Sequence, residues 1–367
     1  MNKLISTLLL YAFDSLGASK EDYYYLSGYL MHVLEVKDFT FEPVDGVDEM
    51  YVPDELVTSI KNRLIDLGYE EDKADKKVTE IFGVLTPLPS VVRQNFYTLH
   101  KRDKEIATDY LYGLSIKNNY VQRTKIEKNI IIQEPSKYNV IMTINLSKPE
   151  KSNADIAKAL KNQTESALYP KCAICIENEG CYGSSKTEPR NNLRLIPMKL
   201  ANEDWYLQYS PYGYFNEHCI VIYNKHVKME VNKTNTRALF DFVDFLPHYF
   251  IGANSDLPIV GGSILSHEHF QGGAFYMPLM RAESKERIIH SKHKDLRFDI
   301  LSWPSFVLRI KGRNKNKIVD VIDEFYQTYL SYSDESIELI NKTSDRHNTF
   351  TTVVEKDDKE YVAYILL

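Results

Sequence analysis

The chain has 367 residues, with 45 lysines and arginines against 51 aspartates and glutamates, which gives a formal net charge of −6. Apolar residues make up 43% and charged residues 26% of the sequence, close to the values of ordinary globular proteins. This composition excludes a disordered, collagen-like or disulfide-scaffold protein. The acidic balance argues against a nucleic-acid partner, and the length allows about two or three domains.

The N-terminal region is expected to be helical over residues 1–125. Its first apolar stretch, residues 4–13, follows a single lysine and has helical periodicity, which favours an amphipathic core helix over a signal peptide. No apolar run approaches the ~20 residues that a membrane span needs, so we expect no membrane partner. Helical periodicity is found in the segments 3–16, 20–36, 53–67, 88–101 and 103–119.

From about residue 126 the pattern changes to strands with few, separate helices, which predicts an α+β region over 126–367 built on a largely antiparallel sheet. We see no internal repeat in the sequence. Helices are expected near 153–167, 234–250 and 315–332. The expected strands are 140–146, 193–198, 205–209, 219–223, 259–271, 274–277, 306–310, 349–354 and 361–366.

The most informative segment is 261–273, which reads Gly-Gly-Ser-Ile-Leu-Ser-His-Glu-His-Phe-Gln-Gly-Gly. On a strand, residues i and i+2 share a face, so His267, His269 and Gln271 are expected to point one way and Glu268 the other. The glycine pairs allow another backbone or a ligand to approach closely. A solvated strand face or a satisfied histidine pair is the structural alternative.

Two chemical interpretations of this segment remain open from the residues alone. Both histidines could be metal ligands, because imidazole is a common ligand. Alternatively, one neutral imidazole could attack a phosphorus centre and form a covalent intermediate, with Gln271 donating a hydrogen bond to a phosphate oxygen. The second role requires a partner on the other ring nitrogen, often a backbone carbonyl.

The four cysteines supply a second clue. Cys172 and Cys175 form a Cys-x-x-Cys pair, which is typical of half a zinc site or of a redox pair. No thioredoxin-like pattern surrounds the pair, so zinc is favoured, and histidines are needed as the other ligands. Cys181 and Cys219 are most simply buried small residues. Such sparse cysteine usage favours a reduced, cytoplasmic setting.

These stretches together resemble class II UDP-glucose–hexose-1-phosphate uridylyltransferase, the bacterial galactose-1-phosphate uridylyltransferase form. The resemblance is carried by residues 248–254 and 258–273. Supporting stretches are Asn-Glu-His-Cys-Ile-Val at 216–221, Leu-Thr-Pro-Leu-Pro-Ser at 85–90, the segments 107–110 and 117–120, and His-Asn-Thr at 347–349. The resemblance spans nearly the whole chain.

The resemblance implies a histidine-triad-like fold with an antiparallel sheet core. It also implies a ping-pong reaction: a histidine takes UMP from UDP-glucose as a covalent uridylyl-histidine, and galactose 1-phosphate then receives it. In the family motif His-x-His-x-Gln the nucleophile is the second histidine, His269 here, and the glutamine that contacts phosphate is Gln271. Glu268, where class I enzymes commonly have proline, is expected to point away from the phosphate.

The resemblance to zinc-binding class I members implies a structural zinc held by Cys172, Cys175, His226 and His267, with His218 as the alternative to His226. Asn254 matches, with altered spacing, an asparagine that contacts phosphate in the family. Further expected substrate-binding residues are Ser263 and Ser266, whose hydroxyls are candidates for the same phosphates, and Arg190 and Arg194, which could bind sugar or pyrophosphate charge.

The expected partners are UDP-glucose and galactose 1-phosphate, and a homodimer is expected. Class II members usually continue past the point where this chain stops, so the resemblance implies missing C-terminal segments. Two other functions remain open: a nucleotide phosphorylase of the same superfamily, with inorganic phosphate as acceptor, and a non-catalytic, zinc-stabilised nucleotide-binding protein.

Overall fold

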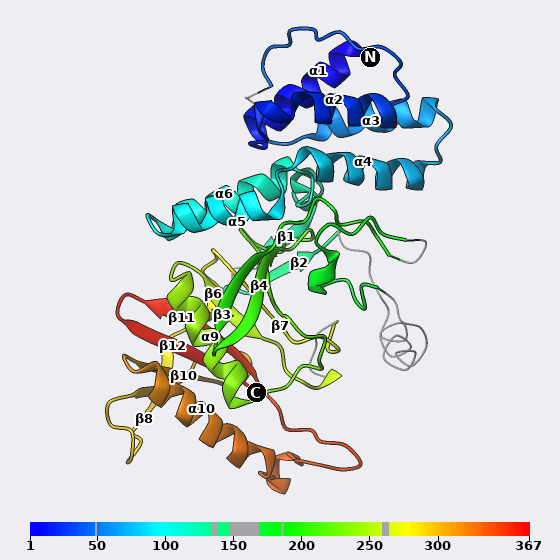
Figure 1. Ribbon diagram of the computed structural model, residues 1–367. Coiled ribbons are helices and arrows are strands. Elements are labelled where there is room, and N and C mark those ends of the chain that lie inside the picture. Colours follow the sequence, from blue (N-terminus) through cyan, green and yellow to red (C-terminus); the bar gives the residue numbers. More distant parts are fainter. Residues whose placement is uncertain (48–49, 134–137, 147–168, 185–186, 259–263) are drawn as a thin grey trace.

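The computed structural model describes residues 1–47, 50–133, 138–146, 169–184, 187–258 and 264–367 (Figure 1). A stack of helices comes first, and a large antiparallel sheet with two long helices follows. The structure therefore confirms the predicted α+β fold class with a helical N-terminal region. Among the described residues, no helix is both long enough and apolar enough to cross a membrane.

The N-terminal helices each bury one apolar stripe. In α3 (Asp54–Asp66) the buried residues Leu56, Ile60 and Leu64 recur every four positions, as the period of an α-helix requires. Helices are found at all five predicted segments, and a further helix, α4, follows α3. The other helices of this region are α1 (Asn2–Leu10), α2 (Tyr23–Val33), α4 (Glu71–Leu85), α5 (Pro89–His100), α6 (Lys104–Lys117) and α7 (Arg123–Ile126).

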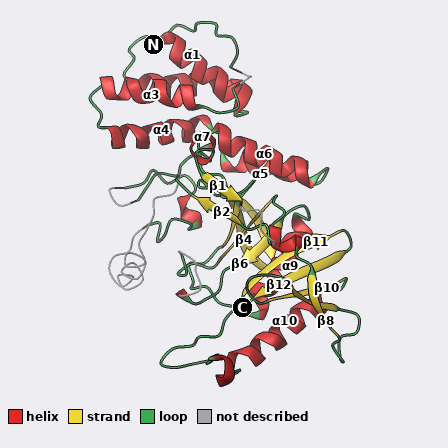
Figure 2. Cartoon of the chain, turned by 180° about the vertical axis from the view of Figure 1, so that it is seen from behind, coloured by secondary structure: helices red, strands yellow, loops and turns green. Residues whose placement is uncertain are grey.

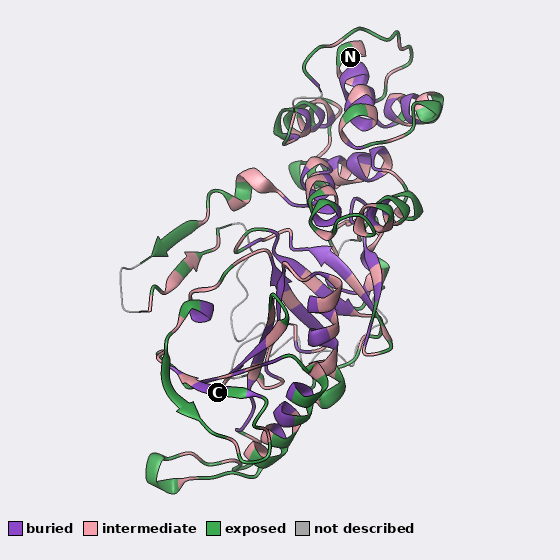
Figure 3. Ribbon diagram, turned by 90° about the vertical axis from the view of Figure 1, so that its left-hand side faces the viewer, coloured by how far each residue is buried: buried purple, intermediate pink, exposed green. Residues whose placement is uncertain are grey.

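A small hairpin follows the helical region. Strands β1 (Ile130–Gln133) and β2 (Ile141–Ile144) pair only with each other, and β2 corresponds to the strand predicted at 140–146. All four residues of β1 are exposed, three of them isoleucines, and the hairpin stands away from the buried strands in Figure 3. It makes no strand pair with the main sheet in the described part of the chain.

In the described part of the chain, the main sheet contains ten antiparallel strands in the order β3-β4-β5-β7-β6-β11-β12-β10-β9-β8. The first five strands in sequence, β3 to β7, form one half of the sheet, and the last five, β8 to β12, form the other. The two halves meet where β6 pairs with β11. The strands are β3 (Ile196–Leu200), β4 (Glu203–Tyr209), β5 (Cys219–Tyr223), β6 (Phe250–Ala253), β7 (His269–Gly273), β8 (Ser284–Ile288), β9 (Arg297–Leu301), β10 (Val307–Gly312), β11 (Thr351–Asp357) and β12 (Glu360–Leu366).

The two halves of this sheet repeat one topology, which the sequence did not reveal. In each half three strands form a meander, a helix follows, and two more strands complete the half. The helices are α9 (Lys233–Phe245) in the first half and α10 (Lys315–Leu330) in the second. In each half the fifth strand lies between the third and the fourth. The strand order is therefore the same when it is read from either edge of the sheet toward the β6–β11 pair at the centre.

Among the described residues, helices cover one face of the sheet. Helix α9 packs on β3, β6 and β11, and α10 packs on β10 and on α9 (Figures 1 and 2). Side chains such as Phe270, Val354 and Ile310 point to this face and join the main hydrophobic core. Alternate residues such as Val353 and Tyr364 point to the opposite face, where they form a smaller apolar cluster.

Some predicted elements differ from the structure. Residues 264–268 form a turn, so the strand predicted at 259–271 begins only at His269; its first residues, 259–263, lie outside the described part, as does the helix predicted at 153–167. Residues 274–277 are not a strand. Strands β1, β6, β8 and β9 were not predicted. β8 is an edge strand with every residue exposed, so it lacks the apolar alternation that marks a half-buried strand.

Candidate active site and metal centre

The centre of the first half-sheet gathers most of the expected site residues. Strand β7 carries His269 and Gln271 and lies between β5 and β6. Gly272 on β7 allows β6 to pack this closely, because a Cβ atom at this position would lie 2.1 Å from the carbonyl oxygen of Phe250 on β6. The second glycine pair of the motif therefore serves the approach of a neighbouring backbone.

The structure brings Cys172, Cys175, His226 and His267 together, with one ligand atom of each within 4.8 Å of the others. The Sγ atom of Cys175 lies 3.2 Å from Nδ1 of His226 and 3.6 Å from Nδ1 of His267. The Sγ atom of Cys172 lies 3.4 Å from that of Cys175 and 3.3 Å from Nδ1 of His267. These side chains come from three separate segments of the chain.

This cluster fits a tetrahedral zinc ion. Ligands at about 2.3 Å for sulfur and about 2.0–2.1 Å for nitrogen stand roughly 3.3–3.8 Å apart around zinc, close to the four separations of 3.2–3.6 Å given above. The largest cause that lowers the pKa of the Cys175 thiol, to about 3, is a hydrogen bond from the thiol of Cys172. The donor set, two cysteines and two histidines, matches a structural zinc site in type and number.

His267 has a second partner that fixes its orientation. Its Nε2 atom lies 2.9 Å from the carbonyl oxygen of Tyr223, at the end of β5. Nε2–H therefore donates to this carbonyl, which leaves Nδ1 unprotonated and facing the two cysteines. Asn178 in turn donates to the carbonyl oxygens of Cys172 and Cys175, at 2.9 Å and 2.8 Å, and so orders the cysteine loop.

His269 is buried, and its ring is oriented by the backbone of His267. The Nδ1 atom of His269 lies 2.8 Å from the carbonyl oxygen of His267, so Nδ1–H donates and Nε2 keeps its lone pair. Burial lowers the pKa of His269 to about 4. The imidazole is therefore neutral near pH 7, as a nitrogen nucleophile must be.

Gln271 is oriented by His218, a residue that sequence analysis considered only as an alternative metal ligand. The backbone N–H of Tyr214 points at Nδ1 of His218, at 3.4 Å, so Nε2 carries the ring proton and donates to Oε1 of Gln271, at 3.1 Å. With its oxygen engaged, Gln271 presents its N–H₂ group as a donor. The sequence pattern Asn-Glu-His at 216–218 drew attention to this segment. The contact between His218 and Gln271, however, depends on the pairing of β5 with β7.

Glu268 faces away from His269. Its Oε2 atom accepts hydrogen bonds from the backbone N–H of Glu230 and from Nδ2 of Asn235, at 2.9 Å and 2.8 Å. Burial raises the pKa of this carboxyl group to about 8. Glu268 thus ties the turn before β7 to the start of α9.

The expected substrate-binding residues fall in three places. Asn254 follows β6 directly; because Ala253 pairs with Phe270, Asn254 lies at the level of His269. Ser266 is half-buried in the turn before His267, and Ser263 lies outside the described residues.

The two arginines lie near the helical region. Arg190 donates to the hydroxyl oxygen of Tyr120, at 3.1 Å. Arg194 is buried, and burial lowers its pKa to about 10. Its guanidinium group donates to main-chain carbonyl oxygens, those of Gly83, Thr86, Pro87, Asn191 and Leu193. The structure therefore does not bring Arg194 to His269; it joins the end of α4 to the start of β3.

Two solved structures resemble the chain distantly. Yeast Ap4A phosphorylase Apa2 is 11% identical, with a TM-score of 0.34 over 65% of this chain and 70% of that one. A DUF4931 family protein from Bacillus cereus is also 11% identical, with a TM-score of 0.33 over 44% of this chain and 81% of that one. At these scores neither likeness bears on the fold or the chemistry.

Sequence relatives are much nearer. The family model described as galactose-1-phosphate uridyl transferase, N-terminal domain, matches residues 46–228. Galactose-1-phosphate uridylyltransferases from Clostridium acetobutylicum and Streptococcus mutans are each 37% identical over 100% of this chain and 74% of their own length. The one from Caldanaerobacter subterraneus is 41% identical over 80% of this chain and 59% of its own length. The chain therefore belongs to the galactose-1-phosphate uridylyltransferase family of nucleotidyltransferases.

Proposed function

We propose that this chain transfers UMP from UDP-glucose to galactose 1-phosphate, with His269 as the nucleophile. Family membership supports the reaction. The observation that carries the residue assignment is the 2.8 Å hydrogen bond from Nδ1 of His269 to the carbonyl oxygen of His267. This bond leaves the Nε2 lone pair available in a buried, uncharged ring.

The reaction follows from this arrangement in two steps. Nε2 of His269 attacks the α-phosphorus of UDP-glucose, a P–N bond forms, and the bond to the bridging oxygen breaks, so glucose 1-phosphate leaves with the electron pair. A phosphate oxygen of galactose 1-phosphate then attacks the same phosphorus. The P–N bond breaks, its electrons return to Nε2, and UDP-galactose leaves.

Gln271 is proposed to stabilise both transition states. Its amide N–H₂ group, oriented by His218, donates a hydrogen bond to a non-bridging oxygen on which negative charge develops. We propose His218 as a positioning residue that acts through Gln271. Asn254 and Ser266 are further proposed phosphate contacts, because both lie beside the start of β7.

Zinc is proposed at Cys172, Cys175, His226 and His267, whose separations fit this ion. When bound, zinc supplies structural cross-linking of three chain segments. The cluster affects the chemistry through His267. The side chain of this residue belongs to the cluster, and its carbonyl oxygen orients the ring of His269.

The broader organisation remains a proposal as well. We propose that residues 126–367 carry the chemistry and that the helical region, residues 1–125, supports them. A cytoplasmic location agrees with four cysteines that form no disulfide. A homodimer is expected from the family resemblance and can be checked by light scattering.

Mass spectrometry of the intact chain after incubation with UDP-glucose tests the proposal. We expect a mass gain of one uridylyl group, loss of this gain in His269→Gly, and its retention in His32→Ala, which removes an exposed histidine of α2. Release of the group by galactose 1-phosphate, and not by inorganic phosphate, identifies the acceptor. A folded wild-type chain that gains no mass, or an adduct that persists in His269→Gly, would contradict the assignment.

A further inference from the structure

The helix-free face of the second half-sheet carries an arginine cluster that the proposed reaction does not use. Arg287 on β8, Arg297 on β9 and Arg309 on β10 converge on the carboxylate of Asp299, which is fully buried. Their nitrogen-to-oxygen distances are 3.1, 2.9 and 3.0 Å respectively. The cross-strand pairs of Asp299 with Arg287 and with Arg309 place these side chains on one face.

The cluster has more positive charge than its carboxylate can neutralise. Burial alone would raise the pKa of Asp299, but hydrogen bonds from the three arginines hold it well below the usual range, so Asp299 is ionised. Its Oδ1 accepts from Ser284 and Arg287, and its Oδ2 accepts from Arg297 and Arg309. Three guanidinium groups against one carboxylate leave two formal positive charges.

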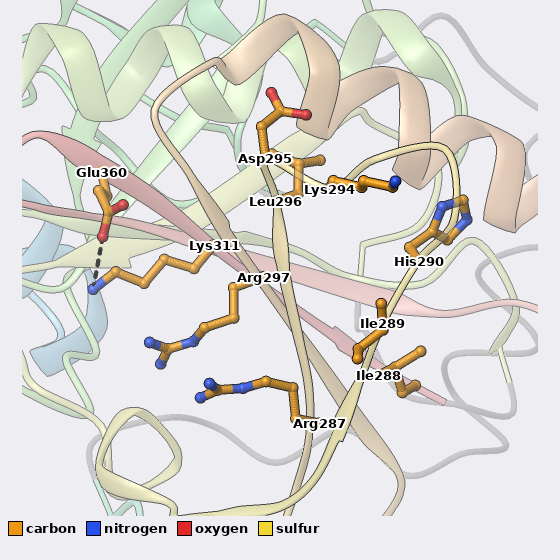
Figure 4. A pocket seen from close by; sticks show the side chains of 10 residues that line it. All are labelled: Arg287, Ile288, Ile289, His290, Lys294, Asp295, Leu296, Arg297, Lys311 and Glu360. Carbon is orange, nitrogen blue, oxygen red and sulfur yellow. Dashed lines mark ion pairs between the residues drawn. The ribbon is translucent and has the colours of Figure 1, made fainter.

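A pocket opens beside this excess charge. It has a volume of about 470 Å³, and Arg287, Arg297, Lys294 and Lys311 are among the residues that line it (Figure 4). The guanidinium groups of Arg287 and Arg297 point the same way in this view. Their side chains are 60% and 46% exposed, so their terminal N–H groups remain accessible beyond the contacts to Asp299.

The acidic groups at the pocket have cationic partners. Glu360 pairs with Lys311, at 3.4 Å, a lysine that it shares with Asp357 outside the pocket, and Asp295 pairs with Lys317, at 2.6 Å. The pocket therefore offers forked N–H donors and no free carboxylate, which is the chemistry that recognises a phosphate group.

We propose that this pocket binds the phosphate group of a small ligand, held by Arg287 and Arg297. The site is separate from the transfer site. The two lie on one sheet face, since Gln271 and Asp299 belong to one cross-strand row that runs through Gly252, Val353, Tyr364 and Arg309. Five strand spacings separate β7 from β9, which is about 24 Å along the sheet.

This distance decides what the bound phosphate can do. A phosphate held at Arg287 and Arg297 cannot reach phosphorus at His269, so it is neither the transferred group nor the attacking one. The ligand is therefore a second one, and its binding does not depend on uridylyl transfer. Its source is either inorganic phosphate or a phosphate monoester.

Calorimetric titration of the whole chain tests the site, with inorganic phosphate and galactose 1-phosphate as separate ligands. The Arg287→Gln/Arg297→Gln double variant should weaken phosphate binding by about tenfold or more. Arg313→Gln, which removes an exposed arginine of the same half-sheet outside the pocket, should change it by less than about twofold. If only galactose 1-phosphate responds to the double variant, the ligand is a monoester.

A second variant guards against a folding defect. Arg287→Lys keeps the charge but loses the fork, so it should weaken binding less than the double variant while circular dichroism remains that of the wild type. Wild-type chain that binds neither ligand overturns the proposal. So does a double variant that binds both ligands as tightly as the wild type, or Arg313→Gln weakened as much as the double variant.

Discussion

The two halves of the sheet share a topology and differ in chemistry. The first half presents His269 and Gln271 on its helix-free face, beside a cysteine–histidine cluster. The second half presents three arginines around one buried aspartate on the same face. Strand β12, which takes the place of β7, contains no histidine. A repeated backbone therefore carries two different sites, because the side chains placed on it decide the chemistry.

The difference also concerns how each site is held. In the first half, all four residues of the cysteine–histidine cluster lie in loops and turns outside the strands, whereas the second half places its charged residues within paired strands. We therefore expect the first site to respond to metal removal and the second to be insensitive to it.

The largest expected effect is that of His267→Ala, which tests most directly whether the two half-sheets hold their sites independently. Removing a ligand from the cluster should abolish stoichiometric zinc and lower the free energy of unfolding by roughly 2–5 kcal/mol. Zinc content by elemental analysis and denaturant unfolding measure both. Hydrogen exchange should accelerate in β5 and β7 and not in β10 and β12; equal acceleration in both halves would show that the sites are not held independently.

His218→Phe tests the positioning of Gln271. We expect kcat to fall about 10-fold to 100-fold with little change in KM, because the amide is misoriented while ground-state binding persists. His218→Asn, which retains a donor, should recover part of kcat. The matched control His293→Phe, in the second half, should leave both constants unchanged. A rise in KM with unchanged kcat would instead place His218 in substrate binding.

The smallest effect is the pH dependence of adduct formation. Because burial lowers the pKa of His269 to about 4, the neutral nucleophile persists in the folded chain well below pH 6. The adduct rate should stay level from about pH 8 to about pH 5 and fall near pH 4. The free energy of unfolding should also fall as the pH falls, because the histidine binds a proton below about pH 6.5 in the unfolded chain and only near pH 4 in the folded one. The contribution of His269 to stability is therefore complete above about pH 6.5 and is lost as the pH falls through about 4. A rate that halves near pH 6.5 would contradict a buried nucleophile.

Local patterns predicted much of the fold and part of the site. The periodicity of α10 and the β-branched run of β5 identify those elements, and the Cys-x-x-Cys and His-x-His-x-Gln patterns identify Cys175 and His269 as candidates. The prediction of a strand at 259–271 was wrong for residues 264–268. Ile264 and Leu265 are typical strand residues, but the chain turns there and places His267 beside the cysteines.

The remaining features depend on contacts between distant residues. Which residue faces Gln271 is set by the pairing of Ile220 with Gln271, and no local pattern contains that register. The same holds for Asp299, whose three arginines come from three strands. Arg194 looked like a candidate for anion binding, yet only the packing of α4 against β3 shows that backbone carbonyls surround it.

The position of His267 has an evolutionary consequence. Its ring belongs to the cysteine cluster and its carbonyl orients the ring of His269, so one codon affects both sites. If the cluster holds zinc as proposed, a substitution of His267 that removes the metal also changes the turn at 264–267 from which the nucleophile is oriented. Substitutions at Cys172, Cys175 or His226 would remove a ligand without replacing the residue that orients His269.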